Sequence, residues 1–112
     1  MVSIILFEKH TAADCSVGNE KALKASIAVK AKLPELYNKY GIKFIGAWAI
    51  HPQHLVVYIF DAPSMEAIQR IELEPEVMNW RCFTTADYQL AAPMEEVEKF
   101  FARKIAIAAK AK

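Results

Sequence analysis

The side chains best suited to metal binding or proton transfer in this 112-residue chain are its three histidines, His10, His51 and His54, and its two cysteines, Cys15 and Cys82. Imidazole and thiolate bind zinc, copper and related transition metals. Histidine also titrates near neutral pH, which suits acid–base catalysis. The spacing matches no zinc finger, because there is no Cys-x-x-Cys pair and His10 precedes Cys15 by five positions. Both chemistries therefore stay open, and either one needs a fold that brings these residues together.

The segments around these residues predict such a fold. Residues rich in β-branched and aromatic types predict strands at 2–8, 42–50, 55–60 and 81–90. Apolar residues at helical spacing predict a long helix from about 20 to 40 and a shorter one from 65 to about 71. The order strand–helix–strand–strand–helix–strand is typical of the ferredoxin-like α+β sandwich, with a four-stranded antiparallel sheet.

Three residues should shape the long helix. Asn19 is a suitable N-cap, and Gly41 suits the left-handed position that ends a helix. Pro34 lies inside the helix and should kink or restart it, because proline lacks an N–H and crowds the preceding turn.

The ferredoxin-like topology gathers the candidate residues at one edge of the sheet. With strand order 4-1-3-2, this edge holds the end of the first strand, the hairpin after the second, and the starts of the third and fourth. All three histidines and Cys82 fall there, and the loop after the first strand adds Cys15. Because the first and third strands are neighbours, His10 and His54 should lie closest together. We therefore expect His10, Cys15 and His54 to bind a small ligand or a transition metal such as zinc.

Five other residues are secondary candidates: Cys82, His51, Glu8, Tyr58 and Trp48. Cys82 is either a fourth metal ligand or a core residue, and His51 is either a ligand or a solvated turn residue. Glu8, like Asp14, is a candidate to orient an imidazole. Tyr58 and Trp48 would line a pocket or belong to the core or an interface.

Composition excludes several classes of function. Lys and Arg total 14 against 13 Asp and Glu, so a nucleic-acid surface is not expected. No apolar run approaches the roughly 20 residues of a membrane helix, and the first residues lack the features of a signal peptide. We therefore expect a cytoplasmic protein, with cysteines reduced rather than bridged. Three glycines make no phosphate-binding loop, so no nucleotide cofactor is expected.

The apolar content points to self-association. The first strand has Ile4 and Leu6 on one side and Ile5 and Phe7 on the other, so both sheet faces should be covered. Helices cover one face, and a second subunit would cover the other, as in a dimeric α+β barrel. Beyond the domain at 1–92, residues 93–112 predict an amphipathic helix that docks on its own subunit or on a partner's.

The segment Phe7-Glu-Lys-His10-Thr11-Ala-Ala-Asp14-Cys15 resembles the opening of small ferredoxin-like proteins in which a strand is followed by His-(Thr/Ser)-x-x-x-Cys. The resemblance extends to Gly41-Ile-Lys-Phe-Ile-Gly-Ala-Trp and to the hairpin Pro52-Gln-His54-Leu-Val-Val-Tyr, and covers roughly residues 3 to 90. It implies the ferredoxin-like fold and singles out His10, Cys15 and His54, but it implies no reaction. The last helix and the segment 72–80 depart from the pattern.

Three functions follow as hypotheses. The first is a protein that binds a transition metal or small ligand at His10, Cys15 and His54. The second is an α+β-barrel enzyme, of monooxygenase or isomerase type, with His10 as the acid–base group and an apolar substrate beside Tyr58 or Trp48. The third is a structural module without a site. An open apolar cleft at His10 favours the second, whereas a filled core with unpaired histidines favours the third.

Overall fold

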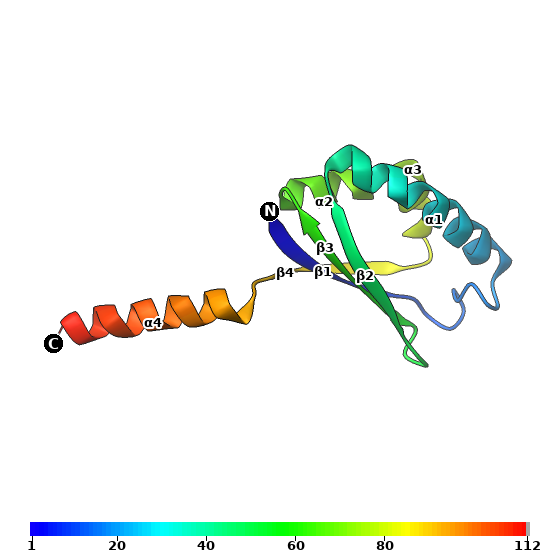
Figure 1. The fold of residues 1–112 in the computed structure, drawn as a ribbon. Helices are drawn as coiled ribbons and strands as arrows, with labels where there is room; N and C mark the ends of the chain where they lie inside the picture. The colour runs from blue at the N-terminus through cyan, green and yellow to red at the C-terminus, as the bar shows by residue number, and fades with distance from the viewer. Residues whose placement is uncertain (112) are drawn as a thin grey trace.

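The structure is a computed structural model, and it describes residues 1–111 (Figure 1). Along the chain the elements are β1 (Val2–Lys9), α1 (Glu20–Tyr40), β2 (Lys43–Ile50), β3 (Leu55–Ala62), α2 (Met65–Glu72), α3 (Pro75–Trp80), β4 (Thr85–Ala91) and α4 (Met94–Lys110). Helices α1, α2 and α3 cover one face of the sheet, and α4 extends away from this body. This is the predicted ferredoxin-like α+β architecture, the protomer fold of dimeric α+β barrels, with an additional C-terminal helix.

The sheet has the predicted order, β2-β3-β1-β4, with antiparallel neighbours throughout. The pairing of β1 with β3 sets Lys9 opposite Leu55, so the residues that follow β1 meet those that precede β3. On the helix-covered face, Ile4 and Phe60 pack with Leu36 of α1 and Ile68 of α2 to form the core.

Both predicted caps of α1 are present. The Asn19 side chain accepts a hydrogen bond from the Ala22 N–H, and Gly41 has a φ of 67°. The helix continues through Pro34, so the expected restart there is wrong. Proline removes only one backbone donor, and Val29 and Leu36, buried on either side of it, hold the helix against the sheet.

The start of the fourth strand differs from the prediction. Instead of beginning at residue 81, β4 begins at Thr85, and residues 81–84 form the turn that follows α3. Pro75 opens α3, and the Thr84 hydroxyl donates to the Trp80 carbonyl, which closes this turn. Cys82 therefore lies in a turn rather than at the edge of the sheet.

The second face of the sheet is covered by none of the described helices. Strand register places on it seven apolar side chains, which we call the open face: Ile5, Phe7, Trp48, Ile50, Leu55, Val57 and Ile59. Trp48 is 54% exposed and Ile50 is 40% exposed. The apolar character predicted for both faces is therefore present, and one face lacks cover within the chain.

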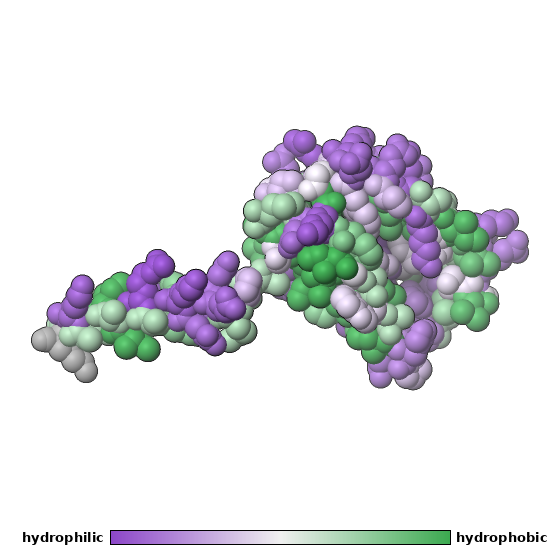
Figure 2. All heavy atoms as spheres, in the orientation of Figure 1, coloured by the Kyte–Doolittle hydropathy of each residue, from purple (hydrophilic) through white to green (hydrophobic). Residues whose placement is uncertain are grey.

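Helix α4 makes the molecule long, with extents of 65 × 32 × 19 Å. None of the residues of α4, all of which the structure describes, is buried. Most of its large hydrophobic side chains are exposed (Figure 2): Met94, Phe100, Phe101, Ile105 and Ile107. The helix therefore does not dock on its own subunit. Among residues 1–111, no helix combines the length and apolar character that a membrane span requires.

Candidate functional site

His10 and His54 meet where β1 ends and β3 begins. The His10 backbone N–H donates to the His54 carbonyl at 3.1 Å, which continues the ladder between the two strands. Their side chains also touch, with His54 Nδ1 3.0 Å from His10 Nε2 and the rings inclined at 75°. One of these nitrogens must carry the proton and the other accept it. His54 has a φ of 52°, a conformation that residues other than glycine adopt mainly in turns and functional sites.

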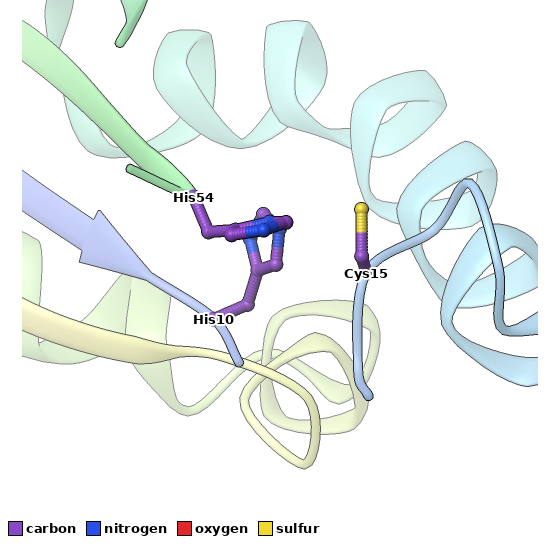
Figure 3. A group of neighbouring side chains, drawn as sticks. All are labelled: His10, Cys15 and His54. Carbon is purple, nitrogen blue, oxygen red and sulfur yellow. The ribbon is translucent and has the colours of Figure 1, made fainter. Parts of the chain in front are cut away.

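The loop after β1 brings Cys15 to the histidine pair (Figure 3). Two turns shape this loop, since the Cys15 N–H donates to the Ala12 carbonyl and the Gly18 N–H donates to the Cys15 carbonyl. The Asn19 side chain, which caps α1, also donates to the Ala13 carbonyl at 3.1 Å. As a result the Cys15 thiol and one nitrogen from each histidine all lie within 4.8 Å of one another.

This spacing suits a tetrahedral ion. Zinc bonds of about 2.0–2.3 Å imply ligand atoms about 3.3–3.8 Å apart at the corners of a tetrahedron. One nitrogen pair of His10 and His54 is 3.0 Å apart, and the donor atoms of His10, Cys15 and His54 all lie within 4.8 Å of one another, so their separations are close to that range. Three protein ligands would leave one position for water or a ligand, as in catalytic zinc sites.

Burial and the neighbouring His54 lower the pKa of His10, with burial the larger cause. Near neutral pH the His10 imidazole is therefore neutral. A neutral imidazole has a lone pair that can bind a metal or accept a proton.

A cavity of about 750 Å³ lies between the sheet and the helices, and His10 and Ser16 contribute to its lining. Most of its wall is apolar or aromatic, including Val29, Leu33 and Phe44. A volume of 300–1,000 Å³ with apolar walls and few polar groups is typical of small-molecule sites.

Inside this cavity Arg81 joins β1 to α2. Its guanidinium lies 2.7 Å from Glu8 and 2.6 Å from Glu72, and it also donates to the Thr84 hydroxyl and the Tyr88 hydroxyl. Burial alone would lower the pKa of Arg81, but the carboxylates of Glu72 and Glu8 outweigh it and raise that pKa. Each carboxylate thus pairs with a half-buried cation.

Tyr58 and Tyr88 belong to the same group of polar side chains as Arg81. The Tyr58 hydroxyl donates to Glu8 at 3.2 Å. Burial raises the pKa of both tyrosines, and nearby carboxylates raise it further: Glu8 for Tyr58 and Glu72 for Tyr88. Both phenols stay protonated in the physiological range; Tyr58 donates to Glu8, and Tyr88 accepts from Arg81.

The secondary candidates fall in different places. Tyr58 and Glu8 line the cavity, but Glu8 accepts from Tyr58 and Arg81 instead of orienting an imidazole. Trp48 lies on the open face, on the side of the sheet away from the cavity. His51 is exposed in the turn between β2 and β3.

Cys82 does not join the cluster, because its turn points it elsewhere: its thiol is exposed and donates to the Met78 carbonyl. Asp14 contacts Thr11 rather than a histidine. Arg81, Glu72 and Tyr88 are not among the site residues predicted from the sequence. Glu72 begins the segment 72–80 and Arg81 follows it, and nothing in the local sequence indicates that the two side chains meet.

No protein-family model matches the chain, and no curated protein matches its sequence. Solved structures do resemble it. The protein Atu4242 from Agrobacterium tumefaciens superposes with a TM-score of 0.55 at 17% identity, over 83% of this chain and 93% of that one. A variant of SnoaB, a cofactor-independent oxygenase from Streptomyces nogalater, superposes with a TM-score of 0.50 at 13% identity, over 82% of this chain and 91% of that one. At these identities the likeness establishes the small α+β fold.

Proposed function

We propose that this protein binds a transition-metal ion at His10, Cys15 and His54, and that the adjoining cavity takes a small, largely apolar molecule. The observation that carries the proposal is the convergence of two imidazole nitrogens and one thiol within 4.8 Å. Mixed nitrogen and sulfur ligands select zinc or copper over magnesium or calcium. Because His10 also lines the cavity, the remaining coordination position would be available to a molecule bound there.

The cavity defines the class of ligand. Its apolar wall favours a hydrophobic or aromatic body, and the few polar groups in its lining favour a ligand with oxygen or nitrogen atoms. The His10 imidazole is able to meet such an atom. The Tyr88 hydroxyl, which accepts from Arg81, can donate its own proton to one, whereas the Tyr58 hydroxyl already donates to Glu8.

Zinc titration of the reduced protein against a chromophoric chelator tests the metal site. We expect one zinc ion per chain and a rise in melting temperature, since an ion at a hundred times its Kd adds about 2.7 kcal/mol to the free energy of unfolding. Magnesium is the matched control and should give no shift, because it prefers oxygen ligands. Absence of stoichiometric zinc and copper binding would contradict the proposal.

A second candidate is a metal-free enzyme with His10 as the acid–base group. The open cavity at His10 favours it, and the lowered pKa of His10 provides a neutral base whose position His54 fixes. SnoaB is a cofactor-independent oxygenase, so metal-free catalysis is compatible with this type of fold. Ligand binding or turnover that survives complete chelation of metals would favour this candidate. A purely structural module is not favoured, because the core contains a cavity and the histidines are paired.

We also propose that residues 1–92 carry the site and associate with a second copy through the open face. A stable interface removes about 1,600 Å² from water, and the open face offers seven apolar side chains on one side of the sheet. Trp48→Glu should weaken self-association at least about tenfold, because it replaces a large exposed aromatic of the open face with a charge, and buried aromatics are among the few residues that dominate interface energies.

Light scattering at micromolar concentration measures this effect. The control is Lys24→Glu on the exposed side of α1, which should leave the mass unchanged. A parent protein that is monomeric, or a Trp48→Glu variant that associates like the parent, would contradict an interface at the open face.

A further inference from the structure

Helix α4 has an apolar surface without a partner in its own chain. Met94, Phe101 and Ile105 are 67%, 56% and 70% exposed, and none of the described α4 residues is buried. An isolated helix of about 15 residues is marginal in water, so α4 needs packing to persist. The partner can be identified from the arrangement of its residues.

The apolar stripe of α4 is symmetric about Phe101. Val97 and Ile105 lie four positions on either side of it, and Met94 and Ala108 lie seven positions on either side. These intervals keep all five side chains on one face of a helix. When two such helices pair antiparallel with Phe101 at the centre, Val97 of one faces Ile105 of the other. The stripe is therefore complementary to itself in that orientation.

The charges of α4 favour the same orientation. The first half, residues 94–101, has three acidic residues and one basic residue, and the second half, residues 102–110, has three basic residues and no acidic one. They are Glu95, Glu96, Glu98 and Lys99, followed by Arg103, Lys104 and Lys110. Antiparallel pairing sets each acidic half against a basic half, whereas parallel pairing opposes like charges. The helix dipole accounts only for charges in the first and last turns, and thus not for Glu98, Arg103 and Lys104.

We infer that α4 is a self-association surface that pairs antiparallel with α4 of a second copy of this chain, about a two-fold axis near Phe101. Such an interface is isologous, because the same patch is used on both subunits. It involves no residue of the metal cluster or the cavity, and it stands independently of the function proposed above. It is also a different surface from the open face.

Disulfide formation tests the geometry in the full-length chain. In a Cys82→Ser background, Phe101→Cys places two thiols beside the proposed axis, where a disulfide needs Cα atoms about 4.4–6.8 Å apart. Lys99→Cys is the control, because positions two residues apart lie on different sides of a helix. Under mild oxidation we expect a covalent dimer to form at least about tenfold faster at position 101. Equal rates at the two positions, or no dimer at position 101, would overturn the inference, as would docking of α4 on a partner's sheet.

Charge exchange tests the orientation with the same readout. Lysine at the three acidic positions 95, 96 and 98 should slow formation of the disulfide at position 101, and glutamate at the three basic positions 103, 104 and 110 should do the same. Combining all six changes should restore the parent rate, because antiparallel halves are again opposite in charge. If the charges instead serve only to stabilise the helix through its dipole, the variant with all six changes should be the least helical by circular dichroism. Its disulfide should then still form slowly, and that result would overturn the antiparallel arrangement.

Discussion

Replacing Arg81 by Met should lower the free energy of unfolding by about 3–5 kcal/mol, the usual cost of removing one partner from a buried ion pair. The guanidinium contacts Glu8 of β1 and Glu72 of α2, and the Glu8 side chain is only 7% exposed. Methionine fills a similar volume but leaves both carboxylates without their cation. One of them must then take up a proton or admit water into the core.

Arg70→Met is the matched control, because Arg70 pairs with Glu66 on the same helix, α2, at the same 2.7 Å distance. Both of those side chains are more than 60% exposed, and surface pairs contribute about 0–1 kcal/mol. Urea denaturation of the two variants measures the difference. If the free energy of unfolding falls by the same small amount in both variants, the ion pairs of Arg81 do not stabilise the fold more than a surface pair does.

The second large effect concerns the metal cluster. His54→Ala should weaken zinc binding by roughly a hundredfold or more. The binding free energy of zinc at a four-ligand site is about 10–16 kcal/mol, which corresponds to about 3 kcal/mol for each ligand. His10→Ala and Cys15→Ala should act similarly, because each removes one of three ligands. Chelator competition measures the affinities.

The chain contains controls for both ligand types. His51→Ala removes an exposed imidazole from the turn that also contains His54, and Cys82→Ala removes an exposed thiol outside the cluster. Neither change should alter zinc affinity by more than about twofold, within the scatter expected for a surface substitution. Loss of affinity in His51→Ala that equals the loss in His54→Ala would point to non-specific binding at surface histidines.

Local signals in the sequence predicted most of the fold. Both ends of α1 can be predicted from single residues. The Asn19 side chain can accept a hydrogen bond from the first turn, and Gly41, which has no side chain, can adopt the left-handed conformation that ends a helix. Strand order follows from the order of elements, and it predicts the neighbouring positions of His10 and His54 that the structure has. The position of Cys15 is harder to predict from the sequence, because its distance from the histidines depends on the path of the loop after β1. Hydrogen bonds to the carbonyls of Ala12 and Ala13 fix that path.

Other features depend on contacts between distant residues. Arg81 lies 73 residues after Glu8, and nothing local to either one indicates that they meet. The composition of 81–90 predicts a strand from residue 81, but residues 81–84 form the turn after α3, which the Thr84 hydroxyl closes, and β4 begins at Thr85. The amphipathic pattern of α4 predicts a helix with an apolar face, but only the structure shows that this face is left uncovered by its own subunit.

Anomalous diffraction from crystals grown with zinc, recorded on both sides of the zinc absorption edge, tests the central claim most directly. The account predicts one strong peak per chain, about 2.0–2.1 Å from His10 Nε2 and His54 Nδ1 and about 2.3 Å from Cys15 Sγ, with its remaining position towards the cavity. A peak at His51 or Cys82 with none in the cluster, or a His10–His54 hydrogen bond that persists unchanged in zinc, would contradict it.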